Sequence, residues 1–256
     1  MPAISKRNTL AILSVVLCAG CTRGIEADLT AKFEAAQQAF EEADRPEDFL
    51  KVAAMYQEII DSGVTSGAVL YNQGNALMRA KQRGRAIAAY RQAQRYRPRD
   101  LDLDASLRYA LGGEAPAAHR PVLETLLFWQ DWLSYREKFS AAAAAVVATF
   151  ALGVAAVIRG GRVWKRLALA GVAVSCLLIF SAGYDWYRFD CIVHGVTVQP
   201  KVVARKGNAL SYEPAFTEEL GEGTEFRLVD RRGDWLLIRL AGSQEGWVPE
   251  DAAVLY

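Results

Sequence analysis

The pattern of apolar and polar positions divides the chain into parts that require different kinds of structure. Apolar residues recur every three to four positions from 29 to 111, form uninterrupted runs at 140–158 and 167–184, and alternate with polar residues after 198. The first pattern predicts amphipathic helices, the second predicts membrane-spanning helices, and the third predicts short β-strands. We therefore expect a multidomain membrane protein: all-α helical repeats, a two-helix transmembrane hairpin and a C-terminal all-β barrel.

The first 21 residues have the features of an export signal. Two basic residues precede an uncharged apolar run at 9–17, and the small residues Ala19 and Gly20 come directly before Cys21. A run this short, followed by small residues, is typical of a signal peptide rather than of a spanning helix. The ending resembles a bacterial lipobox, which implies lipidation of Cys21. The alternatives are ordinary cleavage of the signal or its retention as an anchor.

Residues 22–112 show the pattern of paired helices. The stretch 67–100 resembles a tetratricopeptide repeat (TPR), a helix pair of about 34 residues in which small residues let the two helices approach closely. The matching positions are Gly74, Ala86, Tyr90, Ala93 and Pro98. The preceding stretch 33–66 matches less well, because Phe40 stands in place of the glycine. Residues 101–111 resemble the capping helix that such arrays need.

The resemblance to a TPR also implies a peptide-binding groove. The candidate groove positions on the inner helix are Tyr71, Asn75, Met78 and Arg79. Asn75 would hydrogen-bond to a peptide backbone, and Arg79 would pair with a carboxylate. The alternative is that all four residues face solvent without a ligand.

Charge is distributed unevenly over the two predicted repeats. Residues 26–61 carry ten acidic and three basic side chains, whereas residues 79–99 carry eight basic side chains and no acidic one. One interpretation is that both are solvated helix faces. The other is a dipolar surface that docks a partner of matching polarity through Arg79, Arg83 and Arg95.

Residues 113–139 join the helical part to the apolar runs. This stretch begins with glycines and prolines and continues with an aromatic, amphipathic segment at 122–133. Beside a membrane segment, this composition predicts a helix that lies in the membrane interface. The alternative is a helix that packs on the TPR cap.

The two apolar runs, 140–158 and 167–184, predict a transmembrane hairpin. As helices of 19 and 18 residues each would be about 27–28 Å long, close to the thickness of the hydrocarbon core. The loop 159–166 between them carries four basic residues and no acidic one. The positive-inside rule places this loop in the cytoplasm, so that both flanking parts lie outside. A buried helical hairpin of a soluble protein is the alternative.

After a linker at 185–200, the last part of the chain predicts a small barrel. Residues 201–256 contain several short β-rich runs separated by turn signals, a pattern that favours five short strands. The Gly-Asp-Trp of 233–235 and the Gly-Trp-Val-Pro of 246–249 resemble the bacterial SH3 domain. The candidate ligand-binding residues are Tyr212, Phe216, Trp235 and Trp247. The alternative for these aromatic residues is a place in the barrel core.

The order of signal, TPR pair, membrane hairpin and SH3-like barrel resembles the BatE family of the bacterial aerotolerance (Bat) operons. The resemblance is carried by residues 71–76 (Tyr-Asn-Gln-Gly-Asn-Ala), residues 107–110 (Leu-Arg-Tyr-Ala), the two spans and the SH3-like runs. It implies a non-enzymatic scaffold in the bacterial inner membrane, with both folded domains outside the cytoplasm. The implied partners are von Willebrand A-domain Bat proteins and a MoxR-type ATPase system. The alternative is an anchor or sensor that binds peptidoglycan through the barrel.

Composition and charge narrow the function classes further. A net charge of +1 does not give the basic excess of a nucleic-acid-binding protein. His119 and His194 have no catalytic partner near them in sequence, and the chain has no glycine-rich phosphate loop. We expect no catalytic residue, metal site or cofactor, and both histidines should be exposed. Cys176 should pack within the second span, and Cys191 should be a free thiol.

Overall fold

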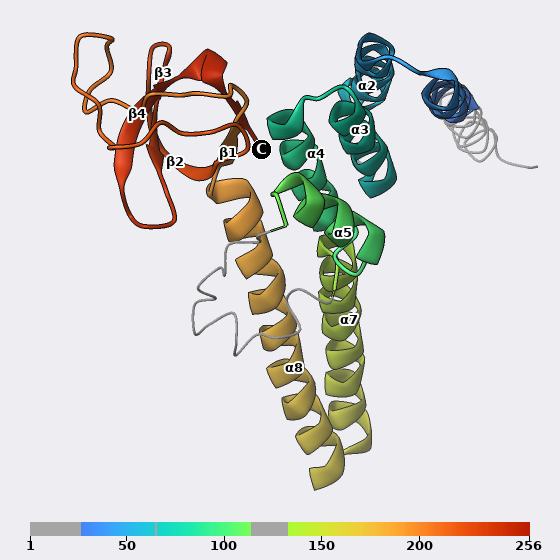
Figure 1. Ribbon diagram of the computed structural model, residues 1–256. Coiled ribbons are helices and arrows are strands. Elements are labelled where there is room, and N and C mark those ends of the chain that lie inside the picture. Colours follow the sequence, from blue (N-terminus) through green and yellow to red (C-terminus); the bar gives the residue numbers. More distant parts are fainter. Residues whose placement is uncertain (1–26, 65, 114–132) are drawn as a thin grey trace, which may run out of the picture.

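The structure, a computed structural model, describes residues 27–64, 66–113 and 133–256. The expected signal peptide with Cys21, the segment 122–132 and His119 lie outside the described residues. The described part is mostly helical. It contains two long apolar helices and ends in a small antiparallel sheet (Figure 1).

The N-terminal part is a stack of helices, here called the helical unit. Its members are a helix at 27–42, α2 (Pro46–Asp61), α3 (Gly67–Arg79), α4 (Arg83–Tyr96) and α5 (Leu101–Ala110). Helix α2 begins with Pro46 at its first position, where the missing N–H costs nothing. The Ser66 and Asp100 side chains accept hydrogen bonds from the first N–H groups of α3 and α5.

The pair α3–α4 is packed as closely as the small residues predict. A Cβ atom on Gly74 would lie 2.5 Å from the ring of Tyr90, so only glycine fits at this crossing. Ala86 and Ala93 are fully buried, and Tyr90 is 2% exposed. The crossing expected from sequence is therefore present, whereas membership of the TPR class stays a prediction.

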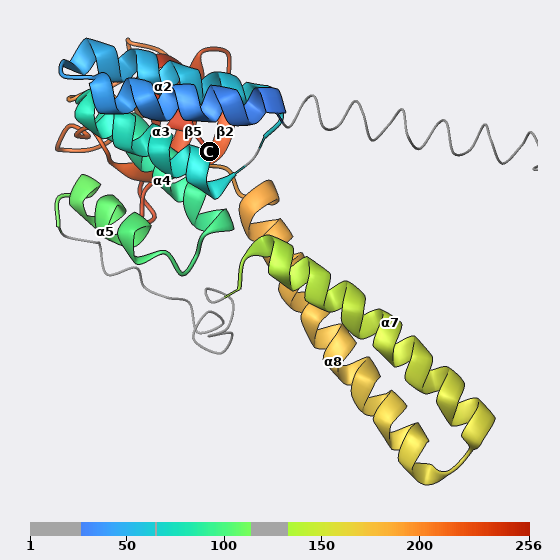
Figure 2. The same ribbon diagram turned by 90° about the vertical axis from the view of Figure 1, so that its right-hand side faces the viewer.

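The two apolar helices are α7 (Tyr135–Arg159) and α8 (Arg162–Trp186), and both are long and apolar enough to cross a membrane. They lie side by side and project from the rest of the molecule (Figures 1 and 2). Each is longer than the predicted span that it contains. Most of the predicted loop 159–166 is therefore helical, and the connection is Gly160 and Gly161, both with positive φ.

Polar and small residues join α7 to α8. Thr149 Oγ1 lies 2.9 Å from Ser175 Oγ, and a Cβ atom on Gly171 would lie 2.8 Å from Thr149 Oγ1. Near the end of the hairpin where α7 begins, Lys138 Nζ lies 2.6 Å from Asp185 Oδ2, and both side chains are less than 5% exposed. The hairpin is therefore a packed pair with a buried ion pair at one end.

The C-terminal part, here called the β unit, is a five-stranded antiparallel sheet in the order β4-β3-β2-β1-β5. The strands are β1 (His194–Thr197), β2 (Glu225–Arg232), β3 (Trp235–Arg239), β4 (Glu245–Pro249) and β5 (Ala253–Leu255). A π-helical turn, η1 (Tyr187–Cys191), follows α8, and a 3-10 turn, η2 (Glu250–Ala252), precedes β5. Closure of this sheet into an SH3-type barrel stays a prediction.

Three expectations for this region are corrected. The stretch 185–200 is not simply a linker, because it contains the end of α8, η1 and β1. Residues 202–204, the first of the β-rich runs from which a strand is expected, do not join the sheet; Val202 forms an isolated bridge with Leu220, and the Ala204 carbonyl oxygen accepts from the Ala215 N–H. His194 is not an exposed bystander: it is half-buried in β1, and its ring stacks on Tyr256 at a centroid distance of 6.2 Å.

The helical unit and the β unit share a hydrophobic core. Val196 of β1 is fully buried within the helical core, and Val254 and Tyr256 at the end of the chain pack against it. Helix α4 contacts α3 as well as β1 and β5. The two units therefore form one body above the hairpin.

Candidate functional site

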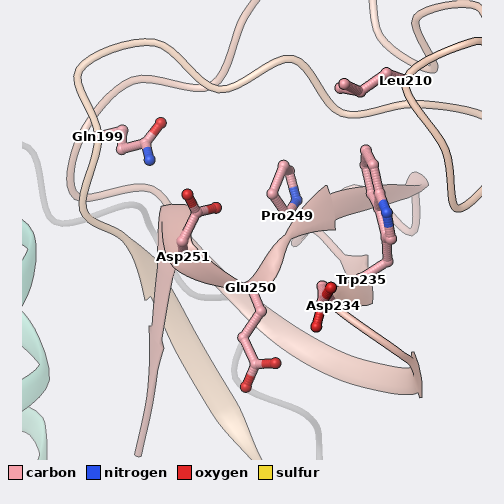
Figure 3. Close-up of a pocket in the computed structure, with 7 residues that line it drawn as sticks. All are labelled: Gln199, Leu210, Asp234, Trp235, Pro249, Glu250 and Asp251. Atoms are coloured by element: carbon pink, nitrogen blue, oxygen red, sulfur yellow. The ribbon is translucent and has the colours of Figure 1, made fainter.

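An open groove lies at the edge of the β unit where β3 begins and β4 leads into η2. The groove is open to solvent, and its volume is about 710 Å³. Its lining residues are Gln199, Leu210, Asp234, Trp235, Pro249, Glu250 and Asp251 (Figure 3). We call it the Trp235 groove.

The β3–β4 hairpin places the apolar wall of this groove. Trp235 is the first residue of β3 and lies opposite Pro249 of β4 in the antiparallel register. Directly opposed residues on one face of a sheet are in side-chain contact range. The backbone N–H of Glu250 donates to the carbonyl oxygen of Asp234 at 2.9 Å, which fixes η2 against the turn before β3. Leu210, 73% exposed, lies above the Trp235 ring in Figure 3.

The remainder of the lining is polar and acidic. Asp234, Glu250 and Asp251 are carboxylates, and none of the seven lining residues is basic. Glu250 points away from Leu210 in Figure 3 and forms an ion pair with Arg231 at 2.7 Å. The groove therefore presents an indole face and, besides the paired Glu250, the two further carboxylates Asp234 and Asp251. Such a surface suits a ligand that carries apolar and basic groups, or a sugar that stacks on the indole.

Of the four aromatic residues predicted to bind a ligand, only Trp235 lines this groove. Trp247 is 9% exposed, with the Arg232 guanidinium 5.4 Å from its ring centroid. Phe216 is partly buried and packs against the β-unit core. Tyr212 is half-exposed, and its ring occupies the space beside Gly207, where a Cβ atom would lie 2.6 Å away. The structure therefore does not bring these four side chains to one surface.

Two of the four predicted groove residues of the helical unit have partners within the chain. Tyr90 donates a hydrogen bond from its hydroxyl to Asn75 Oδ1 at 2.8 Å. The Tyr71 ring lies 6.0 Å from that of Tyr90, its hydroxyl lies 3.5 Å from Ser106 Oγ, and the Arg97 guanidinium lies 5.6 Å from its centroid. Burial raises the pKa of Tyr90, so its hydroxyl stays a donor.

The other two lie towards α2 and the surface. Met78 is partly buried and packs against the helical core. Arg79 is exposed, with its guanidinium 5.8 Å from the Phe49 ring of α2. Peptide binding through these residues stays a prediction, and Arg79 is the exposed member of the set.

Most basic side chains of the segment 79–99 interact with other residues of the same chain. Neither the solvated helix face nor the docking surface expected from sequence anticipated this. Arg83 donates to the carbonyl oxygen of Ala110 at 2.5 Å. Three further arginines pair with acids of other parts of the chain: Arg91 with Glu225, Arg95 with Asp190 and Arg99 with Glu137. Arg95 is therefore not a free docking residue. A spacing of four residues puts side chains on one side of a helix, and this spacing of the three arginines was the signal in the sequence that could have indicated a shared surface.

The described part of the chain contains no candidate metal site. There, no group of three His, Cys, Asp or Glu side chains is arranged to hold a metal ion. Cys191 is a free thiol, as expected, whereas Cys176, expected to be a packing residue within the second span, is exposed on the surface of α8. Comparison with models of protein families, with curated protein sequences and with solved structures gave no match. Fold and site together define a mostly helical protein with two candidate membrane spans and a C-terminal antiparallel sheet that bears an acidic, aromatic groove.

Proposed function

We propose that this protein is a non-enzymatic, membrane-anchored adaptor that binds protein partners outside the cytoplasm. The Trp235 groove carries the proposal. It combines an exposed apolar surface with carboxylates at the edge of the β unit. By resemblance to the BatE family, the partners are von Willebrand A-domain membrane proteins that act with a MoxR-type ATPase in aerotolerance or envelope stress.

The exposed surface of the hairpin supports membrane anchoring. Phe150, Val157 and Ile158 are each more than 70% exposed, and similar side chains line α8. An apolar surface of this extent is unfavourable in water and favourable in hydrocarbon. By the positive-inside rule, the basic residues at the hairpin tip support the proposal that this end lies in the cytoplasm of a bacterium, with the helical and β units on the outer side of its inner membrane. Lipidation of Cys21 would add a second anchor.

A second function is favoured by one feature of the same groove. Gln199 and Asp251 supply hydrogen-bonding groups at the end of the groove opposite Trp235 (Figure 3). A groove with a flat aromatic face at one end and such groups at the other is also suited to a glycan, because the ring stacks on the sugar and the polar groups bind its hydroxyls. Under this alternative the protein anchors or senses peptidoglycan.

The experiment that separates the two functions is affinity purification of the full chain from detergent-solubilised membranes. Wild-type protein should recover von Willebrand A-domain proteins, and Trp235→Ala should lose them. Tyr109→Ala, which removes a 78% exposed aromatic residue of α5 outside the groove, is the matched control and should retain them. Equal recovery by all three proteins would contradict the proposal. Co-sedimentation of wild type, but not Trp235→Ala, with purified peptidoglycan would favour the second function.

A further inference from the structure

Helix α4 and the residues that follow it carry a row of arginines at intervals of four. Arg91, Arg95 and Arg99 each reach an acidic side chain from a different part of the molecule. These partners come from β2 of the β unit, from η1 after the second apolar helix, and from the start of α7. We call the three pairs the arginine row.

The first pair joins the helical unit to the β unit. Arg91 Nε and Nη2 donate to Glu225 Oε1 and Oε2 at 2.6 and 2.8 Å, and the Tyr256 hydroxyl donates to Oε1 at 3.0 Å. Burial alone would raise the pKa of Glu225, but the hydrogen bond and charge of Arg91 outweigh it and lower the pKa. A guanidinium that donates two parallel bonds fixes orientation as well as distance.

The second and third pairs join the helical unit to the hairpin. Arg95 Nη2 donates to both carboxylate oxygens of Asp190, at 3.0 and 2.9 Å. Its guanidinium also lies 4.9 Å from the Tyr135 ring centroid and 5.3 Å from that of Phe189. Arg95 therefore touches the beginning of α7 and the turn after α8 at once. Arg99 Nη2 donates to Glu137 Oε1 at 2.6 Å.

Close backbone packing accompanies these charges. No side chain of its own segment caps the N-terminus of α4, and Glu222 Oε1 of the β unit accepts from the Gly84 N–H at 2.9 Å. A Cβ atom on Gly84 would clash with the carbonyl oxygen of Thr197. One on Gly223 would lie 2.9 Å from Ile87 Cδ1. Gly84 of the helical unit and Gly223 of the β unit therefore permit close contact between the two units. The contact depends on close packing as well as on charge.

From these contacts we infer that the arginine row couples the β unit and the helical unit to the outer end of the hairpin. Chain connectivity joins α8 to the sheet only through the short stretch 187–193, and the core that the two units share contains no residue of α7 or α8. Without the row, the body formed by the two units could swivel on the hairpin. With the row in place, a force or ligand acting on the β unit is transmitted to α7 and α8. The inference goes beyond the proposed function, because it holds whichever ligand occupies the Trp235 groove.

The test measures the distance between spin labels on the helical unit and on the hairpin. Labels at Glu58 of α2 and Lys165 of α8, both exposed, are placed in the full chain with its cysteines replaced by serine, in lipid nanodiscs. The unaltered row should give one narrow distance distribution. Replacing all three arginines of the row by glutamine should at least double its width. Arg239→Gln, which removes the Arg239–Glu245 pair inside the β unit, is the matched control and should leave the width unchanged.

A charge exchange keeps the test decisive if the triple variant does not fold. Arg95→Glu alone should broaden the distribution, and Arg95→Glu combined with Asp190→Arg should narrow it again. An unchanged width in the triple variant, an equal broadening in the Arg239→Gln control, or no recovery on charge exchange would each overturn the inference.

Discussion

Replacing Gly84 by alanine tests most directly whether the β unit packs on α4. Gly84 is the second residue of α4, and its N–H donates to Glu222. An added Cβ would clash with the Thr197 carbonyl oxygen and lie 3.0 Å from the Val198 Cα. Both are backbone atoms and cannot move aside by a side-chain rotation. The methyl group therefore forces the end of β1 away from α4.

The magnitude follows from two opposing terms. Alanine in place of glycine favours a helix by about 0.5–1 kcal/mol. Overpacking a close contact costs about 1–3 kcal/mol, and contact with two backbone atoms at and just after the end of β1 places the cost at Gly84 near the upper end of this range. We expect a net loss of about 2 kcal/mol, or about 4–8 °C in the unfolding midpoint at about 2–4 °C for each kcal/mol.

The assay is thermal unfolding of the full chain in detergent micelles, followed by circular dichroism at one scan rate. Gly221→Ala is the matched control, because Gly221 is exposed, lies close to the same interface and has open space where a Cβ would point. Its midpoint should equal that of wild type. A Gly84→Ala midpoint at or above the wild-type value would refute the packing of the β unit on α4, because only the helix-propensity gain would remain.

Three further predictions concern the hairpin and the sheet. Lys138→Leu removes the cation that pairs with the buried Asp185 carboxylate at 2.6 Å and should destabilise the chain by about 3–5 kcal/mol. Replacing both residues by leucine should restore most of the midpoint, and an equal loss in the double variant would contradict this. Burial lowers the pKa of His194 below its ordinary 6.5, with the charges of Arg188 and Arg227 acting in the same direction and that of Glu225 opposing them. The stability contributed by the neutral ring is therefore fully present above pH 6.5 and is lost as the pH falls. The midpoint of thermal unfolding should drop between pH 7 and pH 5, and His194→Gln should reduce this drop. An unchanged drop in the variant would exclude His194 as its source. In intact spheroplasts, a membrane-impermeant maleimide should label the exposed thiol of Cys191 directly; labelling only after permeabilisation would reverse the proposed topology.

Much of the fold could be predicted because its elements are periodic and long. The 3–4 spacing of apolar residues gave the helices, and small residues such as Gly74 marked where α3 and α4 cross. The uncharged runs gave the two apolar helices, although α7 and α8 extend into their charged flanks. Strand β1 was missed because it has only four residues and three of them are buried, so no alternation of apolar and polar positions marks it.

The site was predicted less completely because it depends on contacts between distant segments. Trp235 was identified, and the register of the β3–β4 hairpin, which places Pro249 opposite it, follows from the turn at 241–244. The contribution of Leu210 and Gln199 depends on how long loops fold over the sheet, which no local pattern encodes. Glu225 and Asp190 likewise become partners of α4 only when the tertiary fold is known.

The central claim is that the Trp235 groove binds a protein partner outside the cytoplasm, and crosslinking from within the groove in living cells tests it most directly. A photoreactive amino acid replaces Leu210, which lines the groove, or Tyr109, which is similarly exposed on α5 outside it. The account predicts that position 210 crosslinks to a von Willebrand A-domain membrane protein and position 109 does not. Equal crosslinking from both positions, or attachment of position 210 to peptidoglycan alone, would contradict it.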